Sequence, residues 1–378
     1  MFHNNITVIM KTAIMVVCHN EALYIDEWIM YHLMLGIDTI LFYDNMSTDL
    51  TFKYLEPYIR LGKVIYNPLN HPILECNPHR MDCVQTHGHK FDFLIFIDVD
   101  EFLYCHDLPT FFSQIDKNIG SIQIPGILIG DKNINPRKGY VTLNYHKYIK
   151  DMTQFKIICR PNAVKSFPNA HTANIKKKSY MQKNISLKGP GNDGLIYYHY
   201  TTKSLKEFLT KNFTTHYHDN KKFDPKIKWR KYTNQMIHPT TVMKNMTIKL
   251  LHKFFEKYHF IIFRRFVFEH EKEIPTIQNN IFEQLHILNI KYDSYIITVF
   301  NANGGKTLLS SSSHINENDI NTKTMDSENE EITNELKEEK KIDKNINIYV
   351  SLKNNKLIDI IHNNIPIYLN YADILITI

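Results

Sequence analysis

The chain contains little glycine and little cysteine, with 12 glycines and 5 cysteines in 378 residues. So few glycines argue against a fold built on repeated glycine loops. The number of cysteines is odd and no two of them have CxxC spacing, which argues against a disulfide framework and against a structural zinc site. We therefore expect reduced cysteines, most of them buried.

Long hydrophobic runs are also missing. A helix that spans a bilayer needs about 20 apolar residues. The run at 14–17 is far shorter, and the run at 260–263 leads directly into Arg264 and Arg265. The first residues show no basic region followed by an apolar core, so we expect no signal peptide and a cytoplasmic location.

Neither sign of charge dominates the chain. Lys and Arg number 45 against 39 Asp and Glu, a formal net charge of +6, and the positive residues are dispersed apart from short runs such as 176–178. A mild basic excess fits an anionic small substrate such as a nucleotide diphosphate, and it fits a membrane surface or nucleic acid equally well. Charge alone therefore does not identify the partner. The hydrophobic fraction of 43% indicates a globular protein with a sizeable core.

Strand and helix signals alternate through the first part of the chain. Apolar and β-branched runs predict strands at 12–18, 39–43, 63–66 and 91–97, and apolar positions at helical spacing predict helices at 22–35, 50–59 and 79–90. Strands that alternate with helices form right-handed βαβ units and a largely parallel sheet. We therefore predict an α/β fold with a mostly parallel central sheet.

The rest of the chain has a less regular pattern. Strands are predicted at 121–129, 155–159 and 195–200, and helices at 204–212 and 242–273. The stretch 310–344 is low in apolar residues and dense in Ser, Asn, Glu and Lys, which is typical of a disordered segment or linker. We expect four parts, which are a main domain at 10–225, a helical extension at 226–300, a disordered linker at 306–345 and a small C-terminal element at 346–378.

Polar clusters follow three of the predicted strands. Asn20 and Glu21 follow the first strand, residues 44–49 follow the second, and residues 98–101 follow the fourth. In parallel sheets, ligands bind beyond the carboxyl ends of the strands. The three clusters are therefore predicted to form one site at one edge of the sheet.

Asp98 and Asp100 are the strongest candidates for a metal site. Alternate side chains of a strand point to the same side, so both carboxylates could face one ion as the strand ends. Carboxylate oxygens suit a hard divalent cation such as Mn²⁺ or Mg²⁺, and that cation can bridge diphosphate oxygens. The alternative is a solvated acidic loop, which is a common setting for an isolated Asp-x-Asp triplet.

Other polar residues have both a functional and a structural interpretation. Asn20 and Glu21 could hydrogen-bond a nucleoside, or they could cap the following helix. Asp44 could bind a base or ribose, or belong to another helix cap. His171 and His199 could each complete a metal shell or contact a phosphate, although a lone histidine is more often structural.

Several motifs occur in an order typical of a known enzyme family. They are the stretches 18–32, 36–38, 43–49, 96–102 and 156–161, then His171, His199-Tyr200, Lys203-Ser204 and Glu207-Phe208. Together they resemble the motifs of glycosyltransferase family 92 and of its relatives in the family 2-like group. The order and spacing of the motifs make this resemblance more specific than any one of them.

The resemblance implies a GT-A fold, a Rossmann-like sandwich that binds a nucleotide-sugar donor with a divalent metal, Mn²⁺ or Mg²⁺. By that analogy, the residues that bind the nucleotide sugar are Asn20, Glu21, Asp44 and Asp98. The metal ligands are Asp98 and Asp100, to which we add His171. His19 departs from the pattern, because relatives often have Lys or Arg at that position.

The implied reaction transfers a hexosyl group from the donor to an acceptor hydroxyl, with inversion at the anomeric carbon. An inverting displacement needs a carboxylate that deprotonates the acceptor. Asp131 is the first candidate for this base, although it could equally be a turn residue, and Glu101 and Asp193 are the others. Lys156 or Arg160 could contact a phosphate, or lie on a solvated surface.

The acceptor is expected to be a glycan, a protein or a lipid, and no nucleic-acid partner is expected. The stretch 242–273 could pack on the core, bind a partner or lie on a membrane, with core packing as the default.

Two alternatives to a transferase stay open. One is a non-catalytic glycan-binding or scaffold protein, whose sequence would lack the Asp-x-Asp triplet that is present here at 98–100. The other is a GT-A-like nucleotidyltransferase, which would lack the pattern at 28–32.

Overall fold

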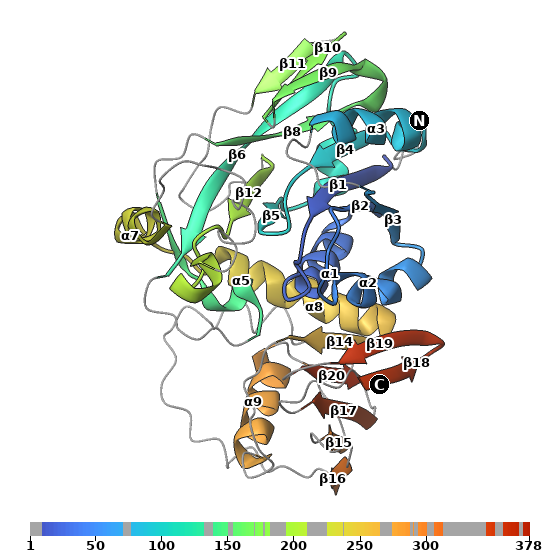
Figure 1. Cartoon of the computed structure of the whole chain (residues 1–378), viewed down its shortest axis with the longest axis vertical. Helices are drawn as coiled ribbons and strands as arrows, with labels where there is room; N and C mark the ends of the chain where they lie inside the picture. Colours follow the sequence, from blue (N-terminus) through green and yellow to red (C-terminus); the bar gives the residue numbers. More distant parts are fainter. Residues whose placement is uncertain are drawn as a thin grey trace, which may run out of the picture.

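A computed structural model gives the fold of most of the chain. The described residues are 10–70, 77–131, 139–149, 154–169, 171–176, 178–181, 194–209, 225–236, 238–264, 274–287, 290, 294–300, 306–312, 345–351, 358–369 and 373–378. Figure 1 shows a large central sheet, a smaller C-terminal sheet and the helix α8 (Val242–Tyr258) between them.

Four parallel strands form the N-terminal half of the central sheet. They are β1 (Thr12–Cys18), β2 (Thr39–Asp44), β3 (Val64–Pro68) and β4 (Phe93–Phe96), in the order β4-β1-β2-β3. The helices α1 (Ile25–Leu35), α2 (Thr51–Arg60) and α3 (Asn77–His87) connect them. The register places Cys18 beside Asp44, and Asp44 beside Pro68. The predicted α/β fold with a mostly parallel sheet is confirmed, and the strand ends meet at one edge as expected.

A long strand, β6 (Ile119–Gly130), widens this sheet. β8 (Phe155–Cys159) pairs antiparallel with both β4 and β6. β12 (Ile196–His199) runs parallel to β6 and antiparallel to β5 (Glu101–Tyr104). β8 and β12 are therefore the two segments that the tertiary structure brings beside the turn at Asp98–Asp100.

Short elements complete this part of the molecule. They are η1 (Gly88–Lys90), α4 (Leu108–Ser113), α5 (Val141–Asn144), β7 (Lys147–Tyr148), η2 (Pro161–Ala163), β9 (Val164–Asn169), β10 (Thr172–Ile175), β11 (Lys178–Met181), a helical turn at 205–209, α7 (Pro225–Gln235) and β13 (His238–Pro239).

The C-terminal sheet joins segments from far apart in the chain. Its strands lie in the order β14 (Phe260–Phe263), β20 (Ile374–Thr377), β17 (Asn345–Ser351), β15 (Ser294–Phe300) and β16 (Lys306–Ser312). A hairpin of β18 (Ile358–His362) and β19 (Ile365–Leu369) packs on α2. α9 (Ile274–Ile287) belongs to the same region of the chain.

Two predictions about this region need correction. The predicted helix 242–273 ends at Tyr258, because His259 adopts a left-handed φ of 61° and β14 follows. All four residues of β14 are buried and pair with β20, a contact that no local pattern reveals. The start of the predicted linker is also a strand, β16, whereas 313–344 lies outside the described residues. The four domain boundaries stay a prediction.

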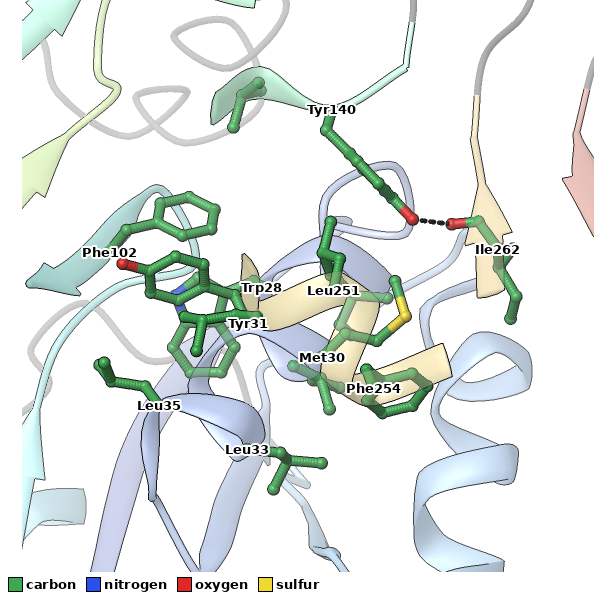
Figure 2. Close-up of a cluster of buried hydrophobic side chains, with 14 of the residues drawn as sticks. Trp28, Met30, Tyr31, Leu33, Leu35, Phe102, Tyr140, Leu251, Phe254 and Ile262 are labelled. Carbon is green, nitrogen blue, oxygen red and sulfur yellow. Dashed lines mark hydrogen bonds between the residues drawn. The ribbon is translucent and has the colours of Figure 1, made fainter. Parts of the chain in front are cut away.

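Helix α1 is the centre of the hydrophobic core. Ten of its eleven residues are buried. Its side chains, with those of α8, form the cluster shown in Figure 2, where Tyr140 also donates a hydrogen bond to the carbonyl of Ile262 at 2.7 Å. Both faces of α1 are covered, so this helix links the central sheet to α8 and to the C-terminal sheet.

The cysteines that the structure describes, Cys18, Cys83, Cys105 and Cys159, are free and buried, as predicted. Within the described ranges, no helix combines the length and the apolar character needed to cross a bilayer.

Candidate functional site

The loops after β1 and β2 are tied together by Asn20. Asn20 adopts a left-handed φ of 57°, and its Oδ1 accepts hydrogen bonds from the backbone N–H groups of Thr48 at 2.8 Å and Asp49 at 3.2 Å. The N–H of Glu21 donates to Thr51 Oγ1 at 3.1 Å. The structure therefore brings Asn20 and Glu21 to the loop after Asp44, as the sheet topology predicted, and gives Asn20 a clear structural role there.

Asp44 is a buried carboxylate at the end of β2. Its Oδ1 accepts the N–H of Ser47 at 2.9 Å, and its Oδ2 accepts the hydroxyl of Tyr66 at 2.6 Å. Burial, followed by the hydrogen bond to Asp44, raises the pKa of Tyr66. Tyr66 lies on β3, so these contacts fix the orientation of Asp44 relative to the neighbouring strand.

The segment Asp98–Asp100 is a turn between β4 and β5. Glu101 closes it, because its N–H donates to the carbonyl of Asp98 at 3.0 Å and its Oε2 accepts the N–H of Asp98 at 2.9 Å. The sequence predicts a strand at 91–97 whose alternation extends to the two aspartates as it ends, but β4 ends at Phe96. Strand alternation therefore does not set their directions, and the Asp98 side chain is 49% exposed whereas that of Asp100 is 2% exposed.

Lys156 on β8 holds one side of this turn. Its Nζ lies 2.6 Å from Asp98 Oδ2 and 2.9 Å from Glu101 Oε2. Burial tends to lower the pKa of Lys156, but the two carboxylates outweigh burial and raise the pKa above its ordinary value. Burial raises the pKa of Glu101, and Lys156 opposes that rise. Lys156 is therefore a buried cation, and the sequence-based alternative of a solvated surface position is wrong.

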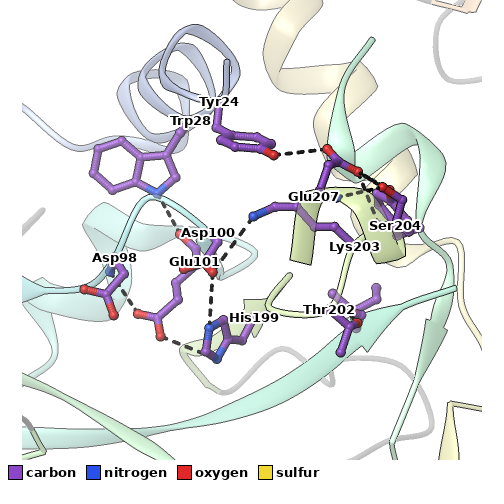
Figure 3. Close-up of polar contacts among 12 residues, drawn as sticks. Tyr24, Trp28, Asp98, Asp100, Glu101, His199, Thr202, Lys203, Ser204 and Glu207 are labelled. Carbon is purple, nitrogen blue, oxygen red and sulfur yellow. Dashed lines mark hydrogen bonds and ion pairs between the residues drawn. The ribbon is translucent and has the colours of Figure 1, made fainter. Parts of the chain in front are cut away.

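Residues from β12 and the loop after it hold the other side, as Figure 3 shows. His199 Nε2 lies 3.6 Å from Asp100 Oδ2, and His199 Nδ1 lies 3.6 Å from Glu101 Oε1. Lys203 Nζ lies 3.9 Å from Asp100 Oδ2. The N–H of Tyr200 donates to the carbonyl of Asp100 at 2.8 Å. Asp100 is thus surrounded by groups that come from a distant part of the chain.

Side chains of helix α1 hydrogen-bond to the backbone at Glu101 and Leu103, directly after the turn. Trp28 donates its Nε1–H to the carbonyl of Glu101 at 2.8 Å, and Tyr31 donates its hydroxyl to the carbonyl of Leu103 at 2.7 Å. His32 accepts the N–H of Leu103 through Nε2 at 3.2 Å. Three side chains of one helix therefore fix the backbone that carries Asp100 and Glu101.

Asp131, His171 and Asp193 are the other residues that the sequence predicts for the site. Asp131 follows β6, is paired with Lys147 at 3.1 Å, and its side chain is 13% exposed. His171 is exposed, and its Nδ1 lies 2.6 Å from the carbonyl of Phe155, the residue before Lys156. Asp193 lies outside the described residues. The roles assigned to Asp131 and His171 stay predictions.

Lys203 and Glu207 appear in the sequence motifs, but the sequence alone suggested no role for them. Ser204 and Glu207 form a capping box, in which the Glu207 N–H donates to Ser204 Oγ at 3.3 Å and the Ser204 N–H donates to Glu207 Oε2 at 3.2 Å. The S-x-x-E spacing could have predicted this helix start. Nothing local could have placed Lys203 beside Asp100.

The donor atoms of the cluster fit a hard divalent ion. Asp98, Asp100 and Glu101 supply carboxylate oxygens and His199 supplies an imidazole, which are ligands that Mn²⁺ accepts. Glu101 Oε1 is buried and accepts no hydrogen bond from the part of the chain that the structure describes. Within that same part, no group of three or more His, Cys, Asp or Glu side chains is arranged to hold a metal ion. The residue types therefore suit a divalent ion, and in this arrangement Lys156 Nζ pairs with Asp98 Oδ2 at 2.6 Å.

Comparison with family models gives one match. The model of glycosyltransferase family 92 matches residues 14–258, which include most of β1, all of β2 to β4, the Asp98–Asp100 turn, β8, β12 and α8. A comparison with curated proteins found no match.

The solved structures that match this chain include complexes with UDP and with GDP-Man. The S. aureus TarS structure is 14% identical over 66% of this chain and 49% of that chain, with a TM-score of 0.32. TarS 1-349 in complex with UDP is 15% identical over 65% and 72%, with a TM-score of 0.33. The mannosyltransferase PcManGT from Pyrobaculum calidifontis, in complex with GDP-Man and Mn²⁺, is 14% identical over 30% and 35%, with a TM-score of 0.26. The chain thus spans about half of the full TarS structure.

Proposed function

Since the chain belongs to glycosyltransferase family 92, we propose that it transfers a hexosyl group from a nucleotide diphosphate sugar to an acceptor hydroxyl, with a divalent metal. The observation that carries this proposal is the Asp98–Asp100 turn. Two carboxylates and an imidazole lie just after β4, in the same sheet in which β1 leads to Asn20 and β2 ends at Asp44.

The carboxyl ends of β1 and β2 are the proposed nucleoside-binding part. Asn20, Glu21 and Asp44 lie there, at the edge where open α/β sheets bind ligands. The hydrogen bonds of Asn20 and Asp44 to the loop 45–49 hold that loop in one shape. A loop shaped before binding reduces the entropy cost of holding the base and ribose.

Asp98 and Asp100 are the proposed metal ligands, with His199 as the nearest imidazole and His171 as the ligand predicted from sequence. A bound Mn²⁺ or Mg²⁺ would neutralise charge on the departing nucleotide diphosphate. Asp98 is half exposed and can meet the donor, whereas Asp100 is held from the protein side by His199 and Lys203.

Asp131 remains the first candidate for the base that deprotonates the acceptor, with inversion at the anomeric carbon. It follows β6 three positions after Leu128, which is the register partner of His199, and so lies toward the site end of that strand. Glu101 is buried at 1% exposure, and its Oε2 pairs with Lys156. These contacts favour a role for Glu101 in holding the turn. The acceptor hydroxyl belongs to a glycan, a protein or a lipid.

A nucleotide-sugar panel tests the proposal. Wild-type protein and Asp100→Ala are incubated with Mn²⁺ and UDP-, GDP-, ADP- and dTDP-hexoses, and release of the nucleotide diphosphate is followed with and without candidate acceptors. We expect turnover with at least one donor, and a loss of about 100-fold or more in Asp100→Ala. Absence of turnover with every donor, together with equal donor binding by both proteins, would contradict a catalytic function.

A further inference from the structure

Lys203 is a buried cation beside Asp100. Its side chain is 3% exposed, its Nζ lies 3.9 Å from Asp100 Oδ2, and the same Nζ lies 4.2 Å from the centre of the Tyr24 ring (Figure 3). Removing an ammonium group from water is costly unless charge and π-electron contacts compensate. Asp100 and the Tyr24 ring supply contacts of these two kinds to Lys203.

The backbone at Lys203 is also strained. Its φ is +37°, in the left-handed region that residues with a Cβ seldom adopt. Contacts on both sides hold it there. Before it, the carbonyl of Thr202 accepts the Nε1–H of Trp229 at 3.2 Å, and after it, Ser204 is fixed by the capping box with Glu207. Such strain is typical of functional sites, where the surrounding structure enforces it.

Glu207 also accepts hydrogen bonds from two tyrosines in other parts of the chain. Its Oε1 accepts the hydroxyl of Tyr24 at 3.1 Å, and its Oε2 accepts the hydroxyl of Tyr145 at 2.7 Å. Tyr24 is the residue whose ring lies under Lys203 Nζ. A single carboxylate therefore positions both the aromatic ring and the chain segment that define the location of the ammonium group.

The two buried lysines of the site differ in their geometry. Lys156 Nζ lies within hydrogen-bond distance of two carboxylates, at 2.6 and 2.9 Å. Lys203 Nζ lies 3.9 Å from Asp100 Oδ2, which is too long for a hydrogen bond. Lys156 is thus suited to clamp the turn. Lys203 is an ion-pair neighbour of Asp100, so its ammonium group lies beside the place where a metal on Asp100 would hold an anion.

We propose that Lys203 binds the diphosphate of the donor and of the nucleotide diphosphate product. This inference rests on the function proposed above. In the transfer, the bond between the anomeric carbon and the β-phosphate oxygen breaks and its electron pair stays on that oxygen. The acceptor oxygen forms the new bond and its proton passes to the base. The ammonium group of Lys203 keeps its protons and offsets the charge that develops on the diphosphate.

The test compares nucleoside diphosphates with monophosphates. Binding of UDP, UMP, GDP and GMP is measured by calorimetry, with Mn²⁺ and again with EDTA, for wild type, Lys203→Met and the matched control Lys206→Met, an exposed lysine on the same segment. A charge-assisted hydrogen bond corresponds to about 10- to 100-fold in affinity. We expect Lys203→Met to weaken the preferred diphosphate by that factor and its monophosphate by less than about 3-fold, while Lys206→Met changes neither.

Three outcomes would overturn this inference. Equal losses for diphosphate and monophosphate would make Lys203 a purely structural residue, and unchanged diphosphate binding would remove it from the site. If Lys203→Met does not fold, Lys203→Gln is measured in its place, and equal losses for diphosphate and monophosphate overturn the inference. Failure of folded wild type to bind any of UDP, GDP, ADP, CDP or dTDP would instead overturn the proposed function itself.

Discussion

At the scale of single residues, the site is a set of buried charges that compensate one another. Glu101 is central, because it caps the turn through Asp98, pairs with Lys156 and lies near His199. Removing one partner of such a buried pair leaves an uncompensated charge, which costs far more than the pair contributes. The residues of the site are therefore predicted to affect both stability and function.

Lys156→Met tests the clamp on the turn. We expect it to lower the free energy of unfolding by about 3–5 kcal/mol at pH 8, because Glu101 loses its counter-ion. Burial already raises the pKa of Glu101, and loss of Lys156 raises it further. A group whose folded pKa is raised stabilises the fold at low pH and loses that contribution as pH rises. The decrease in unfolding free energy caused by Lys156→Met is therefore expected to be smaller at pH 5.

Urea unfolding of wild type and Lys156→Met at both pH values measures this decrease. Lys165→Met, an exposed lysine on β9, is the control, and a pH-independent loss would contradict the explanation.

His32 gives a second test that depends on pH. Burial lowers the pKa of His32 to about 3, against 6.5 for an exposed histidine. Between these values the unfolded chain binds a proton that the folded protein does not, so stability decreases as pH falls. From pH 6.5 to pH 5, His32 is expected to account for a decrease of about 1.5 kcal/mol. Unfolding of wild type and His32→Asn over this range measures the difference, and parallel curves would contradict it.

At the scale of secondary structure, α1 is the element that connects the core to the site. Its Trp28, Tyr31 and His32 side chains all bond to the backbone of β5, while its other face packs on α8. A helix covered on both faces cannot move without disturbing the turn at Asp98–Asp100. We infer that α1 determines the position of Asp100.

Trp28→Phe tests this role of α1. The substitution keeps an aromatic ring but leaves the buried carbonyl of Glu101 without the Nε1–H that it accepts. We expect a loss of about 1–3 kcal/mol in unfolding free energy, together with weaker binding of the preferred nucleoside diphosphate. The matched control is Tyr140→Phe, which also keeps an aromatic ring and removes the donor to a buried carbonyl, that of Ile262 at 2.7 Å. Stability loss with unchanged nucleotide binding would show that α1 does not position the site.

At the scale of the whole molecule, a buried ion network joins the N-terminal sheet to the end of the chain. Arg264 Nε bonds to Asp26 Oδ2 and Arg264 Nη1 bonds to Asp373 Oδ2, both at 2.7 Å. The guanidinium also lies 3.5 Å from the centre of the Tyr54 ring. Asp26 belongs to α1 and Asp373 precedes β20. Residues beyond the family match at 14–258 are therefore bonded to the helix that supports the site.

Arg264→Met tests whether this connection holds the molecule together. The substitution leaves Asp26 and Asp373 as two buried carboxylates with no guanidinium, and we expect a loss of about 3–5 kcal/mol. Thermal unfolding followed by circular dichroism measures it, with Arg230→Met on the exposed face of α7 as the control. A loss below about 1 kcal/mol would show that the two sheets are stable without the network.

The sequence by itself determined the features that depend on nearby residues. Hydrophobic periodicity predicted β1 to β4 and the helices between them, and strand topology placed Asn20, Asp44 and Asp98 at one edge. These features follow from propensity and from apolar patterns within a few turns of chain.

Tertiary structure alone decided the features that depend on distant residues. The pattern at 260–263 predicts the end of a helix, but these residues form β14 and pair with β20. Strand alternation predicts that Asp98 and Asp100 face the same side, but Glu101 closes a turn there. Lys156 and Lys203 reach the two aspartates only because β8 and β12 pair beside β4 and β5. Long-range pairing sets which charges meet and which groups lose water, and no local pattern records either.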